Sequence, residues 1–543
     1  MPILVRNILL GLDEPEERLL ESIAKRLRVP LEAIRHYSVV RRSIDARKKD
    51  ICFSYQVEVA IEGSRKSERE RFKRRHSQDV VWLEPIREPP LRIGKETMPE
   101  RPIIVGFGPG GMFAALRLAQ LGYKPLVLER GREVRRRHRD IMQRFYREKD
   151  FDPTSNLLFG EGGAGTYSDG KLYTRIHDPL CRWVLEAFYH HGAPPQILVD
   201  ARPHIGSDRL PTICTRIRRK IESLGGEIQF ESRLEDLRIS DDAKSGSDRR
   251  LLELNVNNEW ISAGPTVLAI GHSARDTLRM LHRCGVRIEP KPFQIGVRIE
   301  HPQEQVDRWQ YGAAAGHPKL APAEYHMVAK GVGGEHGDLF SFCMCPGGMI
   351  LPSNESPGLV VTNGASRAGR STPFANSGFV ITLDPTKLGF SAMESLDYQT
   401  RWEKLAFDAT HGTYAVPAQR ASDFLAGKRS SGALDISYPL GGEWESIRSV
   451  IPDTVARAIE RALPVLNAKF PGFAGDQGII TGPETRASGP LRIVREKDTR
   501  VARGIDLLYP VGEGAGYAGG IVSAAVDGIK SADAIIGRYA APR

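Results

Sequence analysis

The residues with the clearest chemical potential are three glycines, Gly106, Gly108 and Gly111, in the spacing G-x-G-x-x-G. An apolar run precedes them, a helical segment follows, and a second apolar run ends on Glu129. In such a unit the first glycine permits a tight turn, the second lets the backbone approach a pyrophosphate, and the third lets helix and strand pack closely. The phosphates lie at the positive end of the helix, and the acid accepts hydrogen bonds from a ribose. Residues 103–129 therefore predict a dinucleotide site.

A second glycine-rich segment, residues 507–527, bears on which dinucleotide binds. It contains a short apolar strand, a glycine-dense turn with Glu513, and Gly519 and Gly520 before an apolar helix. It resembles the second FAD fingerprint of the glutathione-reductase-like flavoproteins. This resemblance implies that the acid contacts the ribityl or pyrophosphate portion and that the helix N-terminus faces the flavin pyrimidine, where it stabilises negative charge on a reduced flavin. That family usually has aspartate here, so the contact of Glu513 stays open.

Two more segments agree with FAD as the first-site ligand in place of NAD. Residues 266–271 resemble the motif where the chain re-enters the FAD domain, and residues 159–171 resemble the loop that covers the flavin in the succinate-dehydrogenase and hydroxylase branches, the alternative for this loop being a mobile turn. We expect FAD to bind non-covalently. The residues expected to contact it are Gly106, Gly108, Pro109, Gly110, Gly111, Glu129, Arg130, Gly163, Gly165, Thr166, Ser168, Asp169, Ala269, Gly271, Gly512, Glu513, Gly519, Gly520 and Ile521.

Taken whole, the chain resembles an uncharacterised bacterial and plastid group described as FAD-dependent dehydrogenases, which are NAD(FAD)-utilising dehydrogenase-like proteins. Residues 41–49, 160–175, 343–348 and 512–521 carry the match. The resemblance implies an α/β fold: a Rossmann-like FAD-binding domain of three layers around a mostly parallel sheet, with an inserted α+β substrate domain. It implies no substrate.

The expected domain order begins with a small ferredoxin-like α+β unit, since strand and helix patterns alternate there. The expected bounds are 1–95 for this unit, 100–275 for the first part of the FAD domain, 278–475 for the inserted domain and 476–543 for the rest of the FAD domain. Within them we expect strands at 3–10, 51–61, 294–300, 339–345 and 359–362, helices at 14–27, 398–410 and 455–466, a linker at 85–102, and an exposed hairpin or disordered tip at 240–250.

Four side chains are candidate catalytic residues. Cys343 and Cys345 stand in a C-x-C pair before Pro346-Gly347-Gly348, where they could present a thiol to the flavin or form a redox pair, although this spacing is strained for a disulfide. Buried cysteines also act as small hydrophobes. His272 could shuttle protons or only hydrogen-bond the cofactor. Lys171 could neutralise an anionic flavin or bind a carboxylate substrate; a surface ion pair is the alternative.

These motifs favour an FAD-dependent oxidoreductase that transfers hydride between flavin and a small organic substrate. A second complete nucleotide fingerprint and the C-x-x-C or C-x-x-x-x-C pair of disulfide reductases are absent from the sequence, and so is W-x-W-x-I, which argues against a halogenase. NAD(P)H stays open as a transient electron donor. Two alternatives remain: a flavoprotein that binds or modifies RNA through its basic N-terminal domain, and a non-catalytic FAD-bound scaffold or redox sensor.

Composition bounds the remaining options. The chain has 543 residues, a formal net charge of +10 and six cysteines, which are too few for a disulfide framework and favour a reducing cytoplasm. No run of 18 apolar residues predicts a membrane span, and the first residues lack a signal-peptide pattern. Basic clusters occur, but without a nucleic-acid-binding motif they argue more for solvated helix faces than for a nucleic-acid partner. We expect no metal site, and the oligomeric state stays open.

Overall fold

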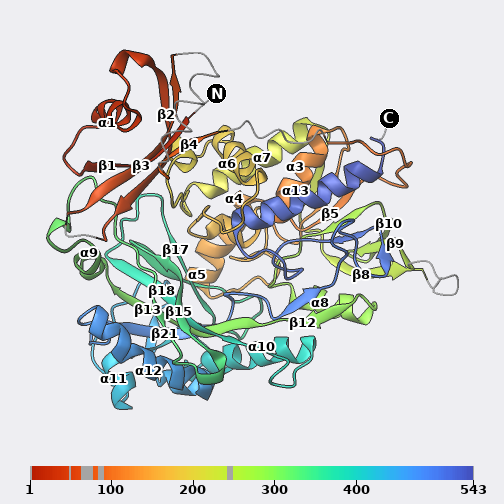
Figure 1. The fold of residues 1–543 in the computed structure, drawn as a ribbon. Helices are drawn as coiled ribbons and strands as arrows, with labels where there is room; N and C mark the ends of the chain where they lie inside the picture. The colour runs from red at the N-terminus through yellow and green to blue at the C-terminus, as the bar shows by residue number, and fades with distance from the viewer. Residues whose placement is uncertain (1–2, 48–49, 63–77, 84–90, 241–248, 542–543) are drawn as a thin grey trace.

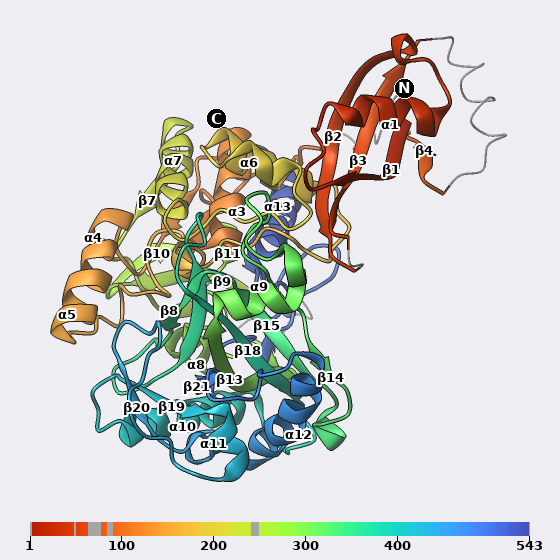
Figure 2. The same cartoon turned by 90° about the vertical axis from the view of Figure 1, so that its left-hand side faces the viewer.

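The computed structural model describes residues 3–47, 50–62, 78–83, 91–240 and 249–541. Three regions follow from its sheets: a small N-terminal unit, a parallel sheet with helices around it, and a long, mostly antiparallel sheet built largely from the middle of the chain (Figure 1). The N-terminal unit projects from the other two, as the rotated view makes plain (Figure 2). Among the described residues, no helix is long and apolar enough to cross a membrane.

The N-terminal unit is a four-stranded antiparallel sheet in the order β2-β3-β1-β4 with one described α-helix. This is the strand order of a ferredoxin-like fold, and residues 63–77, between β3 and β4, lie outside the described residues. The helix starts later than its apolar spacing predicts, because Glu14 accepts a hydrogen bond from Gly11 N and Pro15 opens a turn. The elements are β1 (Ile3–Gly11), α1 (Arg18–Leu27), β2 (Ile34–Asp45), β3 (Cys52–Ile61) and β4 (Val80–Trp82).

The second region is a five-stranded parallel sheet in the order β24-β11-β5-β6-β7. Helices α3 and α13 pack against each other beside it, and a side chain at Gly528 of α13 would lie 2.0 Å from Gly110 O of α3. Glycine therefore lets the two helices approach closely. The elements are β5 (Ile103–Val105), α3 (Pro109–Gln120), β6 (Leu126–Leu128), α6 (Leu180–His190), α7 (Leu210–Ser223), β7 (Glu227–Gln229), β11 (Thr266–Leu268), β24 (Leu508–Pro510) and α13 (Ile521–Arg538).

An antiparallel ribbon of three strands joins the core of this region. Its strands are β8 (Leu234–Ile239), β9 (Arg249–Val256) and β10 (Glu259–Ser262), and β23 (Ile505–Asp506) pairs with β9. Most of the tip expected at 240–250, residues 241–248, lies outside the described residues, as do residues 85–90 of the expected linker.

The third region is a seven-stranded sheet in the order β14-β15-β18-β13-β21-β19-β20, with α10 and α12 packed against it. Its elements are β13 (Phe293–Pro302), α9 (Gln303–Tyr311), β14 (Val328–Ala329), β15 (Leu339–Cys345), β18 (Phe374–Leu383), α10 (Ala392–Ala409), β19 (Val416–Arg420), α11 (Ala421–Ala426), β20 (Gly442–Trp444), α12 (Asp453–Lys469) and β21 (Ile479–Glu484). We call this region the inserted domain.

Two expectations about the inserted domain are wrong. Its sheet does not end before residue 476, because β21 still pairs with β13 and β19, and the chain rejoins the parallel sheet only at β24. The segment 359–362 is mostly an irregular connection, since the paired strand β17 (Thr362–Ser366) begins at its last residue and forms a hairpin with β16 (Gly348–Pro352). The short pair β12 (Ile288–Pro290) and β22 (Leu491–Ile493) connects the two regions.

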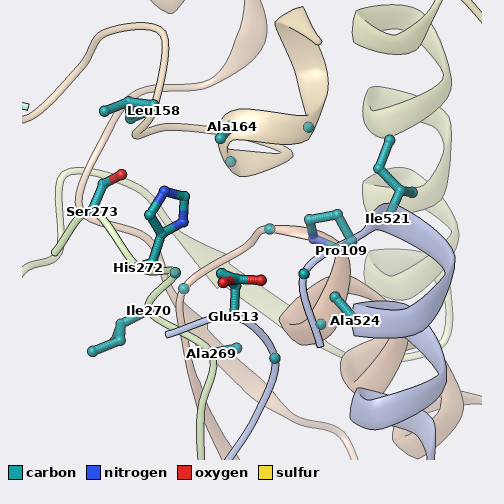
Figure 3. A pocket seen from close by; sticks show the side chains of 18 of the residues that line it. Pro109, Leu158, Ala164, Ala269, Ile270, His272, Ser273, Glu513, Ile521 and Ala524 are labelled. Carbon is teal, nitrogen blue, oxygen red and sulfur yellow. The ribbon is translucent and has the colours of Figure 1, made fainter. Parts of the chain in front are cut away.

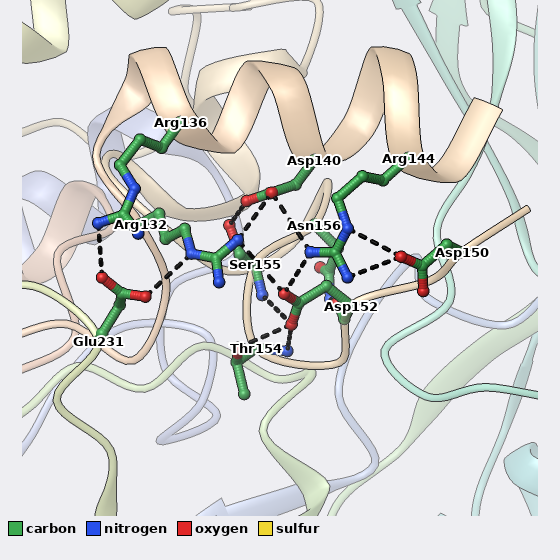
Figure 4. A network of polar contacts seen from close by, with 10 residues as sticks. All are labelled: Arg132, Arg136, Asp140, Arg144, Asp150, Asp152, Thr154, Ser155, Asn156 and Glu231. Carbon is green, nitrogen blue, oxygen red and sulfur yellow. Dashed lines mark hydrogen bonds and ion pairs between the residues drawn. The ribbon is translucent and has the colours of Figure 1, made fainter. Parts of the chain in front are cut away.

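A polar network fixes the chain just before the glycine-rich loop at 159–171 (Figure 4). Asp140 and Arg144 lie in a π-helical turn (Asp140–Phe145) between helices α4 (Val134–Arg139) and α5 (Tyr146–Glu148). Arg132 donates to Asp140 at 2.8 Å, Arg144 donates to Asp152 at 3.1 Å, and Ser155 donates to Asp140 at 2.7 Å. Segment 150–156 is therefore tied to these helices, and several arginines of the basic run pair with acids within the chain.

Candidate functional site

A cavity of about 310 Å³ lies where the carboxyl ends of β5, β6, β11 and β24 meet the inserted domain. In parallel α/β sheets, ligands bind at this edge. The residues expected to contact a cofactor that line it are Gly106, Gly108, Pro109, Gly110, Glu129, Arg130, Gly163, Gly165, Ser168, Asp169, Ala269, Gly271, Gly512, Glu513, Gly519, Gly520 and Ile521. Three of the four candidate catalytic residues, Lys171, His272 and Cys343, line the same cavity.

Two helix N-termini open onto this cavity, those of α3 at Pro109 and of α13 at Ile521 (Figure 3). The first N–H groups of a helix have no partner within it, and they carry partial positive charge. A Cβ added at Gly108 would meet only Gly163 Cα, at 3.9 Å, so this glycine is not demanded by packing within the protein. It leaves open the space beside the α3 N-terminus, as close approach of a pyrophosphate requires.

Glu129 is 4% exposed and holds the turn after β5 and the loop after 159. Its carboxylate accepts hydrogen bonds from the backbone N–H groups of Phe107 at 2.8 Å, Gly131 at 3.0 Å and Gly160 at 2.9 Å. An ionised carboxylate has about four acceptor sites, so one is left for a ribose hydroxyl. Beside it, the Arg130 guanidinium lies 4.4 Å from the Phe159 ring centre.

The glycine-rich loop that closes one side of the cavity is shaped by Arg137, a residue that the sequence patterns did not single out. Arg137 is fully buried and donates to the carbonyl oxygens of Asn156, Glu161 and Gly163 at 2.8, 2.8 and 2.9 Å. Burial lowers the pKa of Arg137 below its ordinary value. Because Gly163 lines the cavity, Arg137 positions a cavity wall without reaching the cavity itself.

His272 and Glu513 lie side by side in the cavity (Figure 3). Burial lowers the pKa of His272 to about 4, a shift that the Glu513 carboxylate partly opposes. The ring is therefore neutral at pH 7, and its Nε2 atom has no hydrogen-bond partner among the described residues. Glu513 accepts a hydrogen bond from Gly489 N at 3.1 Å. A buried polar atom without a partner at this position is what a bound ligand would satisfy.

Lys171 and Cys343 bring the two larger regions together at the cavity. The Lys171 ammonium lies 2.6 Å from an Asp169 carboxylate oxygen and 3.8 Å from Cys343 Sγ. The surface ion pair considered for Lys171 is thus a half-buried one, with a side chain 15% exposed. Proximity to Asp169 raises the pKa of Lys171 despite its burial, so the ammonium stays charged.

Three residues expected at the cofactor do not line the cavity. Gly111 serves packing, because a Cβ there would lie 1.9 Å from Gly106 O. Thr166 is fully buried, and its hydroxyl donates to Glu161 O at 2.7 Å, so it holds the loop from behind. Cys345 is also fully buried, and its thiol donates to Cys343 O at 3.2 Å.

The sequence analysis missed Arg486, which lines the cavity from the segment between β21 and β22. It is 5% exposed and belongs to a buried cluster with Arg275 of α8 (Arg275–Arg283), Glu355 and Glu403. Desolvation and the neighbouring Arg275 lower the pKa of Arg486 well below its ordinary value. Arg486 follows Gly-Pro-Glu-Thr and belongs to no recognisable sequence motif, so only the three-dimensional structure places it at the cavity.

The residues present fit FAD. Two helix N-termini and an open glycine suit a pyrophosphate, Glu129 suits a ribose, and the neutral His272 has a free nitrogen in the same cavity. A further wall comes from the inserted domain through Phe342, Cys343 and Asn363. We call these three residues the inserted-domain wall.

Comparisons with known proteins bear on the cofactor. Residues 292–487 match the family "FAD-dependent protein, C-terminal domain-like", and residues 2–60 match a domain of unknown function. The match covers most of the inserted domain, including β21, and it identifies FAD as the cofactor.

Among solved structures, the chain is similar to a geranylgeranyl bacteriochlorophyll reductase-like protein of Thermoplasma acidophilum, at 14% identity and a TM-score of 0.34 over 81% of this chain and 78% of that one. It is also similar to L-proline dehydrogenase from P. horikoshii, at 11% identity and a TM-score of 0.37 over 83% and 96%. An uncharacterised protein of Clostridium beijerinckii (strain ATCC 51743 / NCIMB 8052) is 41% identical over 548 residues and all of both chains. The chain belongs to the same family as this clostridial protein, a family whose inserted domain is that of FAD-dependent proteins.

Proposed function

We propose that the protein is an FAD-dependent oxidoreductase that binds FAD non-covalently and acts on a small organic substrate. The observation that carries the proposal is the meeting of two kinds of wall in one cavity. One wall has the helix N-termini and the acid that suit a dinucleotide, and the inserted-domain wall brings a thiol beside the charged Lys171. A cofactor held only as a scaffold would not need reactive side chains at its cavity.

When bound, FAD supplies the two-electron chemistry, and the protein supplies binding, orientation and electrostatics. The N-termini of α3 and α13 offer N–H groups to negative charge, and the dipole of α13 favours a reduced, anionic ring system. Lys171 adds a fixed positive charge from the half-buried loop. His272 is neutral at pH 7, so it can accept or donate a hydrogen bond there without carrying charge.

The electron donor that we propose is NADH or NADPH, docking transiently. The sequence has one complete strand, G-x-G-x-x-G, helix and acid unit, and we assign this unit to FAD. A nicotinamide nucleotide would therefore have to reach the flavin without a Rossmann domain of its own. We place this approach between the glycine-rich loop and the inserted-domain wall, both of which line the cavity.

The test is the visible absorption spectrum of the purified protein under anaerobic conditions. We expect flavin bands that bleach on addition of NADH or NADPH, and acid precipitation that releases all of the flavin into the supernatant. Flavin that stays with the precipitated protein would contradict non-covalent binding. A bound flavin that neither nucleotide nor any candidate substrate reduces would favour the scaffold alternative over an oxidoreductase.

A further inference from the structure

Cys343 occupies an unusual place in its strand. The pairing of β15 with β18 is regular up to Phe342 and resumes at Cys345, so Cys343 and Met344 form a bulge. Cys343 has a φ of +44°, in the left-handed region that residues with a Cβ seldom adopt. Met344 is 3% exposed in the core of the inserted domain, whereas Cys343 lines the FAD cavity. Bulges re-aim side chains in this way, at some cost in backbone strain.

Two cations contact Cys343, one at its sulfur and one at its backbone oxygen. The Lys171 ammonium is 3.8 Å from Cys343 Sγ and 3.7 Å from Cys345 Sγ, so one cation faces both thiols. From β13, the fully buried Arg298 donates to Cys343 O at 3.3 Å. These contacts favour a negative sulfur at Cys343.

Two carboxylates also lie near Cys343, and each of them forms an ion pair with a cation. Asp169 pairs with Lys171 and accepts a hydrogen bond from Ser366 N at 3.0 Å. Glu484 of β21 forms a two-point ion pair with Arg298 at 2.7 and 2.8 Å. Tyr173, next along the chain from the loop, has a pKa raised by burial and stays neutral. Each carboxylate is thus balanced by a cation before the Cys343 sulfur is counted.

The balance of these groups lowers the pKa of Cys343 to about 5, chiefly through the neighbouring Cys345 thiol and the charges of Lys171 and Arg298, against the effect of burial. The pKa of Cys345 moves the other way, well above its ordinary value, because it is the proton donor of the pair and is buried. Cys284 and Cys214 have pKa values raised to about 11 and about 12, mainly by burial. The labelling rates of these two cysteines are therefore internal standards against which the rate of Cys343 is compared.

We propose that Cys343 is a nucleophilic residue of the FAD cavity and that its sulfur bonds reversibly to an electrophilic carbon of the substrate, the β-carbon of a conjugated carbonyl compound. The sulfur supplies the electron pair of the new S–C bond. The π pair of the C=C bond moves toward the carbonyl oxygen, whose negative charge falls beside the Lys171 ammonium, and a proton from Cys345 or solvent completes the addition. Nothing is oxidised or reduced in this step.

This inference rests on the proposed oxidoreductase function for its substrate, but thiol reactivity is measured without turnover. N-ethylmaleimide, itself a conjugated carbonyl compound, is added in limiting amount to the FAD-loaded protein at pH 6.5, 7.5 and 8.5. The labelled cysteines are then mapped by peptide mass spectrometry. We expect Cys343 to be labelled first, at a rate that changes less than about twofold across this range because its thiol is already ionised. Labelling of Cys284 should rise about tenfold per pH unit.

Two variants separate the effect of the Cys345 thiol on Cys343 from the general effect of removing a cysteine. Cys345→Ala removes the thiol that donates to Cys343, so we expect Cys343 labelling at pH 6.5 to fall about tenfold and to regain its rate at pH 8.5. The matched control, Cys284→Ala, removes a cysteine whose sulfur contacts Asp236 instead, and it should leave the Cys343 profile unchanged. Cys343→Ser should abolish the fast adduct. An unchanged flavin spectrum shows that each variant is folded and loaded.

Two results would overturn the proposal: no label at Cys343 in the FAD-loaded protein with excess reagent, or a Cys343 rate that rises with pH as steeply as that of Cys284. A different measurement would contradict the proposed oxidoreductase function: a bound flavin whose absorption bands no electron donor bleaches. Fast labelling of Cys343 together with an unreactive flavin would leave a thiol nucleophile in a non-redox protein. A reactive flavin with an inert Cys343 would leave an oxidoreductase that binds its substrate without this bond.

Discussion

At the scale of single residues, the glycines of the first fingerprint have separable roles. A Cβ at Gly108 meets only Gly163 Cα at 3.9 Å, whereas a Cβ at Gly111 would lie 1.9 Å from Gly106 O and 3.1 Å from Ile104 Cγ2. We expect Gly108→Ala to keep the melting temperature of the FAD-free protein and to weaken FAD binding at least tenfold, or about 1.4 kcal/mol. Gly111→Ala should lower that melting temperature. Fluorescence titration with FAD and thermal unfolding measure the two effects.

The control for this pair is Gly369→Ala, which should change neither quantity, since a Cβ there has no neighbour within 4 Å. If Gly108→Ala bound FAD as tightly as the unchanged protein, the α3 N-terminus would not be the pyrophosphate site. The opposite finding, a Gly108→Ala protein that melts early even without FAD, would mean that this glycine serves packing as Gly111 does.

The sequence allowed the cavity-facing glycines, Glu129 and Glu513 to be named because their roles depend on neighbours within one strand–turn–helix unit. It did not allow Arg137 or Arg486 to be named. The partners of Arg137 lie 19 to 26 residues away, and those of Arg486 lie 83 and 131 residues away, so no local spacing marks either one. Thr166 lies in the expected loop, but its hydroxyl donates to Glu161 O and does not face the cavity.

At the scale of elements, a buried ionic cluster fastens helix α10 of the inserted domain to helix α8 of the FAD domain. Glu403 of α10 is fully buried and accepts hydrogen bonds from Arg275 at 2.7 and 2.8 Å and from Arg486 at 3.1 and 3.2 Å. Because Arg486 also lines the FAD cavity, the contact between these helices supports one of its walls.

Removing one carboxylate from this cluster should be costly. We expect Glu403→Ala to lower the free energy of unfolding by about 3–5 kcal/mol, since it leaves two buried guanidinium groups with too few partners. The matched control on the same helix is Asp397→Ala. Asp397 is 65% exposed and pairs with Arg279 at the surface, so its loss should cost less than about 1 kcal/mol. Chemical denaturation followed by fluorescence measures both, and equal losses would mean that the cluster is no more than a surface ion pair in its effect.

Periodicity located helix α10 but placed its start six residues late. The capping box of Ser391 and Glu394, visible in the sequence as S-x-x-E, marks the observed start. The strands of the inserted domain were harder to assign to a sheet. Strand β21 lies in sequence beside the return to the FAD domain, and only its pairing with β13 and β19 shows that it belongs to the inserted domain. Such pairings join residues 59 or more positions apart, which a local pattern does not encode.

At the scale of the whole molecule, the formal net charge is +10, but several of the basic side chains are paired with acids or buried and so are not free to contact a partner. In the basic run 130–147, Arg132 and Arg136 pair with Glu231, and Arg144 pairs with Asp150 (Figure 4). Arg137 is buried. These contacts neutralise part of the basic run, and we propose that nucleic acid is not the partner of this face. The RNA alternative rests on the basic N-terminal unit, in which β2 carries Arg41 and Arg42.

The N-terminal unit is joined to the rest of the chain without taking part in the cavity. Arg42 N donates to Val199 O at 2.7 Å, Ala201 N donates to Arg42 O at 2.8 Å, and the Arg42 side chain lies 3.0 Å from Asp200. Every cavity-lining residue comes after position 104. By contrast, residues near 94–96 hydrogen-bond to the end of α13 and belong to the FAD domain. The unit therefore ends, in structural terms, before residue 91.

We accordingly expect a chain that starts at residue 91 to bind FAD within about twofold of the full-length affinity, because its cavity is complete. A tenfold loss of affinity would require the loss of about 1.4 kcal/mol of binding free energy. FAD titration of both chains measures this. In the full-length protein, Arg42→Ala loosens the contact with Asp200 and should likewise leave FAD affinity unchanged, which separates loss of contact from loss of the unit. A truncated chain that no longer holds FAD, beside an Arg42→Ala protein that does, would show that the N-terminal unit supports the fold of the FAD domain. If flavin reduction rather than FAD binding fails on truncation, the unit takes part in access of the electron donor or substrate.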